Sequence, residues 1–375
     1  MKQEVKMIDL SAEYLQQKAE IDQAIQEVLM SGEFVRGKAV SVFEQKLSAY
    51  LHVNYTISCG NGTDALQIAL MALQIGHGDE VIIPAFSYAA VAEVICLLGA
   101  IPVFADVDET YFQLDSTKIE ELIGPKTKAI IPVHLFGQCA DMDAIMAISE
   151  KHHLYVIEDN AQALGASYLS KSLKKRDLGG IGHIGCTSFF PTKNLACYGD
   201  GGALFTNDAA LAEKIRMIAN HGQRKRYEHE VIGVNSRLDT LQAAILNVKL
   251  NHLPDSLKRK KEIAEYYFQN LKDTEGLLLP QSYPAVNHSW HQFTIRVKNG
   301  KRDVLQAFLK EQGIQSMLYY AKTLDQQQAY AIFKKQSCPV SEMLTSEVLS
   351  LPIHSNLKEE ELLYICTAIK TFFYA

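Results

Sequence analysis

The sequence lacks the cysteine patterns that indicate a disulfide framework, a structural zinc site or a redox dithiol. It contains seven cysteines, an odd number, and no two of them have the CxxC spacing. Most lie in apolar segments, which favours reduced thiols inside a core, so no metal site is expected. The cysteines are Cys59, Cys96, Cys139, Cys186, Cys197, Cys338 and Cys366.

The sequence also lacks an excess of positive charge, a long apolar run and a low-complexity tract. Its 37 basic and 43 acidic residues leave a formal charge of −6, so electrostatics gives no reason to expect nucleic acid or an anionic membrane as a partner. The longest apolar runs are too short to span a bilayer, and the first residues lack the apolar core of a signal peptide. We expect a cytoplasmic protein that binds neither nucleic acid nor membranes.

Short apolar runs alternate with helix-like segments between about residues 55 and 207. This alternation predicts an α/β fold, with a mostly parallel sheet of seven strands between helices. Ligands of such sheets bind at the carboxyl ends of the strands. The expected strands are 55–59, 80–84, 102–106, 129–133, 154–159, 187–190 and 203–206, and the expected helices are 63–73, 89–98, 116–122, 142–152 and 209–220.

A region with a different rhythm follows a long helical stretch at 238–270. It contains a strand at 291–298 and helices at 301–312 and 359–373, and a chain of 375 residues is long enough for two cores. We predict a large cofactor-binding domain at 1–250 and a smaller C-terminal α/β domain at 251–375, with a boundary defined only to within tens of residues. The N-terminal segment is compatible with packing on either domain.

One lysine stands out because it follows an apolar, strand-like run and precedes a glycine-rich turn. Lys193 ends the run SFFPTK, and the turn YGDGG comes at 198–202. Burial lowers the pKa of a lysine and frees its amine to act as nucleophile and base, although a surface lysine is the alternative. Asp159 closes another strand, where a charge is seldom placed for packing alone. Pyridoxal phosphate (PLP) needs such a pair, an amine for its aldehyde and an acid for its ring nitrogen.

A phosphate site is expected beside this pair. The run SCGNGTD at 58–64 leads from a strand through glycines into a helix, whose free amides favour an anion. Ser188 would add a hydroxyl to the same phosphate. The alternative is an ordinary turn with Thr63 or Asp64 as the helix N-cap.

Two further side chains match the pyridine ring of PLP. Tyr88 lies beyond the strand at 80–84, where its ring would stack on the cofactor, and a buried core tyrosine is the alternative. Gln162, three residues after Asp159, would donate a hydrogen bond to the phenolic oxygen of the ring. The alternative for Gln162 is a residue that merely begins a helix.

Seven segments, in order along nearly the whole chain, resemble the DegT-type sugar-nucleotide aminotransferases, which are PLP enzymes of aspartate-aminotransferase fold type I. Several such motifs in order are specific, whereas any one alone is weak. The resemblance implies a homodimer with active sites at the subunit interface. The segments are NGTDALQIAL at 61–70, GDEVIIP at 78–84, PVHLFGQCADMDAI at 132–145, IEDNAQALGA at 157–166, TSFFPTKNL at 187–195, YGDGGALFTND at 198–208 and GVNSRLDTLQAAIL at 233–246.

The resemblance implies a role for individual residues. Lys193 would be the catalytic lysine that bonds to the PLP aldehyde. Asn235 would reach the phosphate from the partner subunit, and a turn residue or helix N-cap is the alternative. In related dehydratases a histidine replaces the lysine, so Lys193 favours transamination. The cofactor-binding residues implied are Gly62, Thr63, Tyr88, Asp159, Gln162, Ser188, Lys193 and Asn235.

Within this family the chain looks closest to enzymes that aminate C3 of UDP-2-acetamido-2-deoxy-3-oxo-glucuronate for cell-surface polysaccharide. L-glutamate would give its amino group to the cofactor and leave as 2-oxoglutarate, and the keto sugar would then receive the amino group. Arg237 would hold a carboxylate of the sugar or of glutamate, with an ion pair at the subunit interface, for example to Asp239, as the alternative. Other functions left open are amination of a dTDP-linked 3-keto- or 4-keto-6-deoxyhexose, a PLP-dependent sugar dehydratase or lyase, and a non-catalytic PLP-binding regulatory protein.

Two segments depart from the pattern of this family. Tyr319 and Ala321 stand where close relatives have the histidine and first proline of His-Tyr-Pro-x-Pro. The loop with Tyr319 and Tyr320 is expected to contact the substrate from the neighbouring subunit, so this change bears on the choice of sugar. Ala196 replaces a frequent glycine after KNL, which either narrows the pocket or only adjusts the turn.

Overall fold

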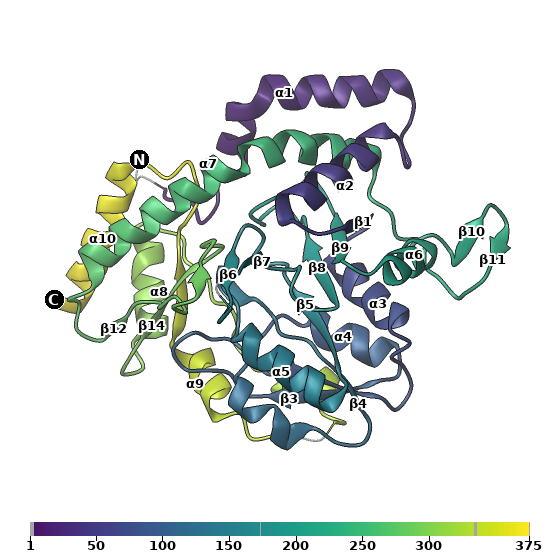
Figure 1. Ribbon diagram of the computed structural model, residues 1–375. Helices are drawn as coiled ribbons and strands as arrows, with labels where there is room; N and C mark the ends of the chain where they lie inside the picture. Colours follow the sequence, from purple (N-terminus) through teal and green to yellow (C-terminus); the bar gives the residue numbers. More distant parts are fainter. Residues whose placement is uncertain (1–3, 173, 334–335, 375) are drawn as a thin grey trace.

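The computed structural model describes residues 4–172, 174–333 and 336–374. Its central sheet has the strand order β1-β9-β8-β5-β4-β2-β3, in which β9 runs antiparallel to the other six (Figure 1). This confirms the predicted mostly parallel sheet of seven strands. The strands are β1 (Tyr55–Cys59), β2 (Glu80–Pro84), β3 (Ile101–Ala105), β4 (Thr127–Ile130), β5 (Tyr155–Asp159), β8 (Ile184–Ser188) and β9 (Gly202–Thr206).

Helices cover both faces of this sheet. In β2, Val81 and Ile83 pack in the cluster that contains α3 and α4, whereas Ile82 packs in the cluster that contains α5. Successive side chains of a strand point to opposite faces, so a strand covered on both faces is apolar throughout. The helices around the sheet are α2 (Lys38–Leu51), α3 (Gly62–Ala72), α4 (Ala90–Leu97), α5 (Met142–His152) and α6 (Ala209–Ile218).

Two features in the first half of the chain differ from the sequence pattern. The helix expected at 116–122 is wrong, because that segment forms two 3₁₀ turns, η1 (Ser116–Lys118) and η2 (Glu120–Leu122). Pro125 follows so closely that a longer helix has no room to form. The segment before residue 51, which the pattern leaves unassigned, forms α1 (Leu10–Ser31) and α2, and both pack on α7.

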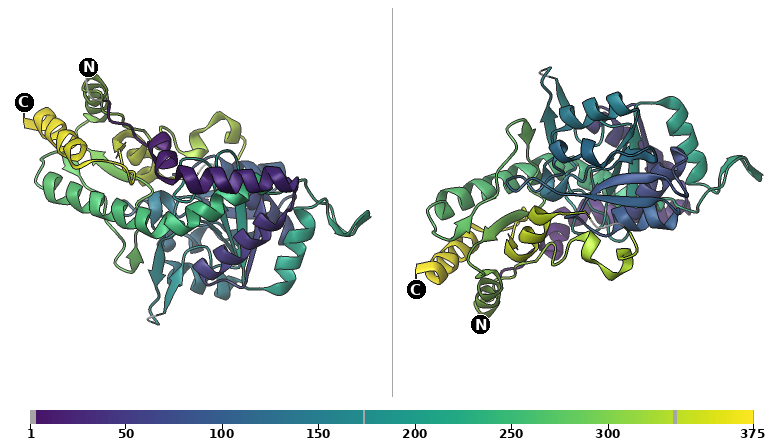
Figure 2. Two further views of the ribbon diagram at one scale, coloured as in Figure 1. Left: turned by 90° about the horizontal axis from the view of Figure 1, so that it is seen from above. Right: turned by 90° about the horizontal axis from the view of Figure 1, so that it is seen from below.

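One long helix, α7 (Thr240–Leu271), passes through residue 250, where the domain boundary is expected. Along it lies α1 (Figure 2), while Val5 packs in the C-terminal core with Ile263 and Phe293. The N-terminal segment therefore contacts both regions of the molecule. The division into domains at 1–250 and 251–375 stays a prediction.

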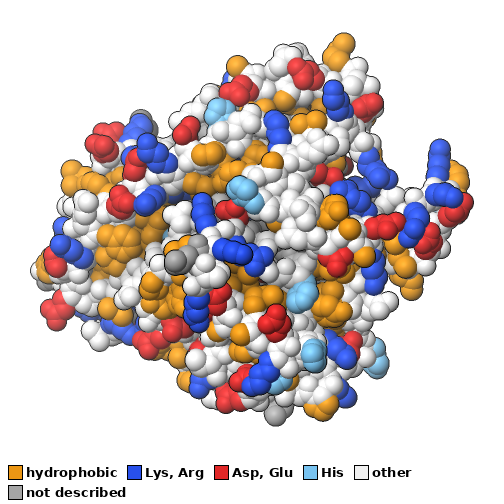
Figure 3. All heavy atoms as spheres, in the orientation of Figure 1, with side chains coloured by type: hydrophobic (Ala, Val, Ile, Leu, Met, Phe, Trp, Pro, Cys, Tyr) orange, Lys and Arg blue, Asp and Glu red, His pale blue; other side chains and the backbone are white. Residues whose placement is uncertain are grey.

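The C-terminal region builds its core on an antiparallel sheet with the order β12-β14-β15. A hairpin of β10 and β11 projects from the body of the molecule (Figures 1 and 2). On the face shown in Figure 3, acidic and basic side chains are interspersed. No helix within the described ranges is long and apolar enough to cross a bilayer. The remaining elements are β6 (Ser167–Leu169), β7 (Lys175–Asp177), β10 (Gln223–Lys225), β11 (Glu228–His229), β12 (Leu277–Leu278), β13 (Val286–Asn287), β14 (Phe293–Val297), α8 (Arg302–Glu311), η4 (Leu324–Gln326), η5 (Gln328–Tyr330), α9 (Pro339–Glu347), β15 (Val348–Leu351) and α10 (Glu359–Tyr374).

Candidate active site

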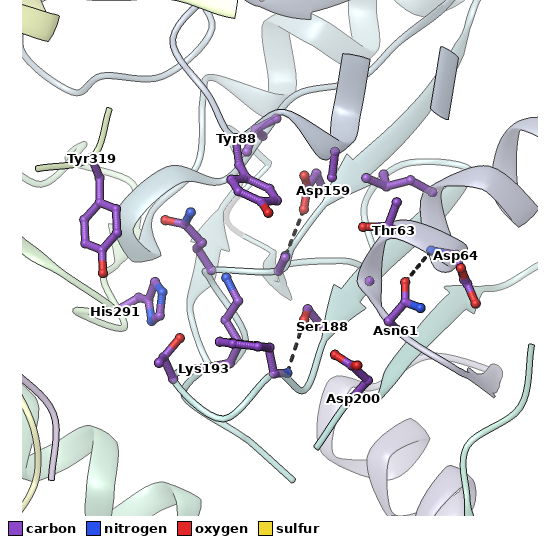
Figure 4. A pocket seen from close by; sticks show the side chains of 18 of the residues that line it. Asn61, Thr63, Asp64, Tyr88, Asp159, Ser188, Lys193, Asp200, His291 and Tyr319 are labelled. Carbon is purple, nitrogen blue, oxygen red and sulfur yellow. Dashed lines mark hydrogen bonds between the residues drawn. The ribbon is translucent and has the colours of Figure 1, made fainter. Parts of the chain in front are cut away.

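A cavity of about 640 Å³ lies at the carboxyl ends of β5 and β8 and at the N-terminus of α3. His291 and Tyr319, from the C-terminal region, line its other side (Figure 4). The structure brings most of the predicted site residues together in this one cavity. These are Gly62, Thr63, Tyr88, Asp159, Gln162, Ser188, Lys193, Tyr319 and Tyr320.

Lys193 lies in the turn that follows β8. Its backbone N–H donates a hydrogen bond to the carbonyl of Phe190 (2.9 Å), and its side chain extends into the cavity (Figure 4). Burial lowers the pKa of Lys193 to about 8, although the nearby carboxylate of Asp159 acts in the opposite direction. About half of this amine is therefore a neutral nucleophile at pH 8.

Asp159 is the last residue of β5 and is only 8% exposed. The backbone on both sides is fixed, because its N–H donates to the carbonyl of Pro132 and its carbonyl accepts from the N–H of His134 (both 2.9 Å). Burial raises the pKa of Asp159, against the lowering effects of the Ala161 N–H and of Lys193. A cation beside this carboxylate would offset the cost of burying its charge, and a protonated pyridine nitrogen is such a cation.

The amide of Gln162 is held at both ends. Its Oε1 accepts a hydrogen bond from the N–H of Phe136 (2.9 Å), which lies in the 3₁₀ turn η3 (Leu135–Gly137). Its Nε2 donates to the hydroxyl of Tyr320 (3.0 Å). These contacts fix which end of the amide is the donor, and Nε2 keeps a second N–H for a ligand oxygen.

The N-terminus of α3 fits a phosphate. Asn61 is its N-cap and accepts a hydrogen bond from the N–H of Asp64 (2.8 Å), so the interpretation of Thr63 or Asp64 as the N-cap is wrong. Within the described chain, the amides of Gly62 and Thr63 have no hydrogen-bond partner. A Cβ at Gly62 would lie 2.7 Å from the Cβ of Ser188, so glycine is what lets this helix approach β8. Two free amides beside a hydroxyl suit an anion.

The three tyrosines of the cavity exclude one alternative and correct one expectation. Tyr88 is 60% exposed, so it is not a core residue, and its ring lies 6.2 Å from that of Tyr320. Tyr319 and Tyr320 line the cavity of the chain that carries Lys193. The expectation that their loop comes from the neighbouring subunit is therefore wrong for this cavity. The reason is that the N–H of Met317 donates to Ser350 of β15 (3.1 Å), which ties the loop to its own C-terminal sheet.

Asn235 and Arg237 do not line this cavity. Asn235 is exposed and pairs with Asn220 in an isolated bridge. The Arg237 side chain has no hydrogen-bond or ion-pair partner among the described residues, and its alternative role in an interfacial ion pair stays a prediction. Both residues lie between the β10–β11 hairpin and α7. Their assigned roles require a partner subunit and stay predictions.

Sequence reasoning missed His291, which is 5% exposed and lines the cavity. Behind the turn of Lys193, it also missed Lys260, whose Nζ donates to Oδ1 of Asn194 (2.8 Å). The run HSWHQF at 288–293 does place two histidines just before a strand, but nothing in it indicates which part of the molecule that strand approaches. Ala196 is buried and is not a lining residue, so the cavity wall does not use it directly.

Comparisons with known proteins agree with this geometry. The model of the DegT/DnrJ/EryC1/StrS aminotransferase family matches residues 15–370. Over 97% of this chain and 99% of the relative, the sequence is 46% identical to UDP-2-acetamido-2-deoxy-3-oxo-D-glucuronate aminotransferase of Pseudomonas aeruginosa. It is 42% identical to dTDP-3-amino-3,6-dideoxy-alpha-D-galactopyranose transaminase of Aneurinibacillus thermoaerophilus, over 99% and 100% of the two chains.

A solved structure shows the same fold. The structure of DesV from S. venezuelae in complex with a ketimine intermediate matches with a TM-score of 0.95 and 39% identity, over 99% of both chains. With the family model covering most of the chain, this likeness confirms fold type I. The chain therefore belongs to the DegT/DnrJ/EryC1/StrS aminotransferase family and is a PLP-dependent aminotransferase.

Proposed function

We propose that this enzyme aminates a nucleotide-linked keto sugar, at C3 of UDP-2-acetamido-2-deoxy-3-oxo-glucuronate, with L-glutamate as the amino donor. The product would enter a cell-surface polysaccharide such as the O-antigen of lipopolysaccharide. The observation that carries the transamination is the meeting of Lys193 and Asp159 in one cavity. The 46% identity to the Pseudomonas enzyme supports this sugar.

The cavity fits PLP at each polar group of the cofactor. The amides of Gly62 and Thr63 and the hydroxyl of Ser188 would hold the phosphate. Asp159 would accept a hydrogen bond from the protonated ring nitrogen, and the second N–H of Gln162 would donate to the phenolic oxygen. Bound PLP supplies an electron-withdrawing ring that stabilises negative charge next to the amino nitrogen.

Lys193 and Tyr88 would act on the two sides of that ring. With a pKa of about 8, the Lys193 amine is able to take up and return a proton close to neutral pH. The exposed ring of Tyr88 has a free face on which a pyridine can stack. The residues of this chain thus orient the reacting atoms and move the proton.

We further propose a homodimer with shared active sites, in which Asn235 and Arg237 reach into the cavity of the partner. Two observations support this role: Asn235 is exposed, and the guanidinium of Arg237 has no partner within the described ranges of the chain. Mixing Lys193→Ala and Asn235→Ala subunits tests it, because one site of each mixed dimer would regain both native residues. Activity that does not recover on mixing, while mixed dimers form, would reject shared sites.

Amination of a dTDP-linked 3-keto- or 4-keto-6-deoxyhexose is the second candidate. The 42% identity to the dTDP-sugar transaminase favours it, and the altered loop around Tyr319 lines the cavity where a sugar would bind. Neither observation depends on a carboxylate in the substrate.

A panel of keto sugars separates these candidates. The pyridoxamine form of the enzyme is mixed with UDP- and dTDP-linked keto sugars, and the amino sugar formed is identified by mass spectrometry. We expect product from the UDP-linked 3-keto uronate. Product from a neutral dTDP-linked deoxy sugar alone would overturn the uronate assignment.

The donor reaction is measured separately, with glutamate and the PLP form. Release of 2-oxoglutarate in proportion to amino sugar is expected of transamination. A sugar that loses a hydroxyl without consuming glutamate would indicate a dehydratase or lyase, and a cofactor spectrum that glutamate leaves unchanged would indicate a non-catalytic regulatory protein.

A further inference from the structure

His291 is a buried side chain of the cavity that the roles above do not use. It is 5% exposed and lines the cavity beside Lys193 (Figure 4). Its Nδ1 is buried without a partner, and Nε2 has no hydrogen-bond partner within the described chain either. Leaving Nδ1 buried without a partner is costly, because this nitrogen has lost water and gained no hydrogen bond in exchange. Its place at the cavity wall indicates a ligand group that completes its hydrogen bonds.

Basic groups surround this histidine. Burial has the largest effect in holding the pKa of His291 well below its ordinary value, and Lys193, Lys260 and His288 lower it further. Burial also lowers the pKa values of Lys193 and Lys260 to about 8. An anion among basic groups with lowered pKa values stabilises the protonated form of each of them.

The acidic groups of this neighbourhood are already placed. Asp159 interacts with Lys193, and Glu13 interacts with Lys260. Neither carboxylate has a comparable interaction with His291, whose charged neighbours are all basic. An anion at His291 must therefore come from outside the described chain.

The position of His291 is coupled to that of Gln162. Phe136 uses both backbone groups, since its N–H donates to Gln162 (2.9 Å) and its carbonyl accepts from the N–H of Gln292 (3.2 Å). In the same turn, a Cβ on Gly137 would lie 2.8 Å from the backbone N of His291, at a φ of +110°. One turn thus fixes His291 relative to the expected cofactor ring, and such preorganisation is typical of substrate-binding groups.

We propose that His291 binds a carboxylate of the substrate at the end of the cavity opposite to α3, with Lys260 as a positioning residue that acts through Asn194. This inference rests on the proposed function, because transamination brings a carboxylate to the cavity with glutamate and again with a sugar acid. Figure 4 shows His291 and Tyr319 on one side of Lys193, and Thr63 and Asp64 on the other. The phosphate end and this carboxylate end would thus hold the two charged parts of the bound molecules apart.

The two sources of the carboxylate are tested in separate arms by calorimetric titration of the PLP enzyme. The first arm uses 2-oxoglutarate. The second compares UDP-N-acetylglucosaminuronic acid with UDP-N-acetylglucosamine, which has a hydroxymethyl group in place of the carboxylate. His291→Gln and His291→Ala are compared with the native chain, and His252→Gln, which alters an exposed histidine paired with Glu20, is the control.

We expect His291→Ala to weaken the binding of 2-oxoglutarate, of the sugar acid, or of both, by about tenfold or more, which is the usual size of a hydrogen bond to a charged group. The neutral sugar nucleotide should bind within about twofold of its native affinity, as expected of a site that it does not reach. Loss confined to one arm names the source of the carboxylate. An equal loss for the neutral sugar nucleotide, or native affinity for both acids, would overturn the inference.

Failure of the proposed function has a different signature. If neither UDP-sugar binds the native enzyme, the uronate assignment fails, whereas a His291-dependent affinity for 2-oxoglutarate would still support the carboxylate site. Circular dichroism and PLP content establish that each variant is folded and loaded before titration.

Lys260→Met supplies a second measurement that does not alter the cavity wall. In the pyridoxamine form both lysine amines are free, and carboxylate binding favours their protonated forms. Glutarate is the ligand here, because it lacks the keto group and does not react with the pyridoxamine form. Its affinity should therefore fall as pH rises from about 7 to 9.5, through the pKa values near 8. Lys260→Met should reduce this dependence. A native affinity that stays constant over this range would contradict a carboxylate among these bases.

Discussion

The two ends of the cavity are built in different ways. At the end near α3, Gly62, Asp159 and Ser188 each lie at or just beyond the end of a strand of one sheet. At the other end, His291 and Tyr319 come from segments of the C-terminal region that reach the cavity through tertiary contacts. The first end matches the fixed shape of a cofactor. We infer that the second end is where substrates are distinguished, since its residues are free to change without moving the sheet.

The largest expected loss of activity is at Lys193, which lies between the two ends of the cavity. Lys193→Ala removes the amine that moves the proton, so kcat for 2-oxoglutarate formation should fall by about 10³-fold or more. Reduction with borohydride followed by mass spectrometry should find no cofactor attached to the variant. Lys310→Ala, on the exposed surface of α8, should keep native turnover. Native turnover in Lys193→Ala would refute the assignment of the catalytic lysine.

Asp159→Asn removes the charge at the cofactor end while keeping the size of the side chain. We expect kcat to fall by about 100-fold, as for other groups that stabilise charge in a reacting site. Glu158→Gln, its neighbour on β5, is the comparison. Glu158 accepts hydrogen bonds from Gly179 and Ile181 (2.9 and 2.7 Å), so its loss should lower the melting temperature with turnover within a few-fold of native. Equal losses of turnover in both variants would remove the special role of Asp159.

The pH dependence of cofactor uptake tests the environment of Lys193. Only the neutral amine attacks an aldehyde, so covalent uptake of PLP by the apoenzyme should rise with pH and level off above a pKa of about 8. Between pH 7 and 9 the expected rise is about tenfold. Stopped-flow absorbance measures it. A rate that keeps rising toward pH 10.5 would indicate a lysine with an ordinary exposed pKa.

Gly62→Ala tests the close approach of α3 to β8. A Cβ at this position would lie 2.7 Å from that of Ser188, so the helix must shift away from the phosphate position. We expect PLP to bind about tenfold more weakly, in line with the cost of overpacking, as measured by fluorescence titration of the apoenzyme. Gly76→Ala meets its nearest atom only at 3.7 Å and should bind PLP normally. Unchanged affinity in Gly62→Ala would place the phosphate elsewhere.

The smallest change in activity is expected from a substitution at the end of the cavity that the C-terminal region builds. Tyr319→His introduces the residue that the family resemblance leads us to expect at this position, without touching the sheet. The ratio of kcat/KM between UDP- and dTDP-linked keto sugars should change by about threefold to tenfold, the usual range for one altered pocket contact, while PLP affinity stays native. A change in PLP affinity with no change in this ratio would mean that the two ends are not separable.

Much of the cofactor end could be predicted because its determinants are local. The run EVIIP is apolar throughout since both faces of β2 are covered, and Asp159 and Lys193 stand next to strands that a period of two makes visible. The helix predicted at 116–122 was wrong, although its determinants are also local. At 116–122 the helical pattern is too short, and Pro125 limits the segment to two 3₁₀ turns.

The end of the cavity that the C-terminal region builds could not be predicted in the same manner. Tyr319 was expected from the neighbouring subunit, yet Met317 ties its loop to β15 of the same chain. His291 carried no signal, because its importance depends on Phe136 and Gly137 lying against it. Contacts between segments so far apart in the chain are set by packing, and residue spacing does not encode them visibly.

By itself, the sequence determined the α/β order, the strand-end positions of Asp159 and Lys193 and the glycine that admits α3, because these depend on periodicity and backbone freedom within short segments. Only the tertiary structure decided that Tyr320 of the same chain accepts a hydrogen bond from Gln162, and that His291, whose Nδ1 has no partner among the described residues, lines the same cavity. It also decided that burial lowers the pKa values of both Lys193 and Lys260 to about 8. Burial and charge are properties of the packed chain, because they depend on what surrounds a residue rather than on what precedes it.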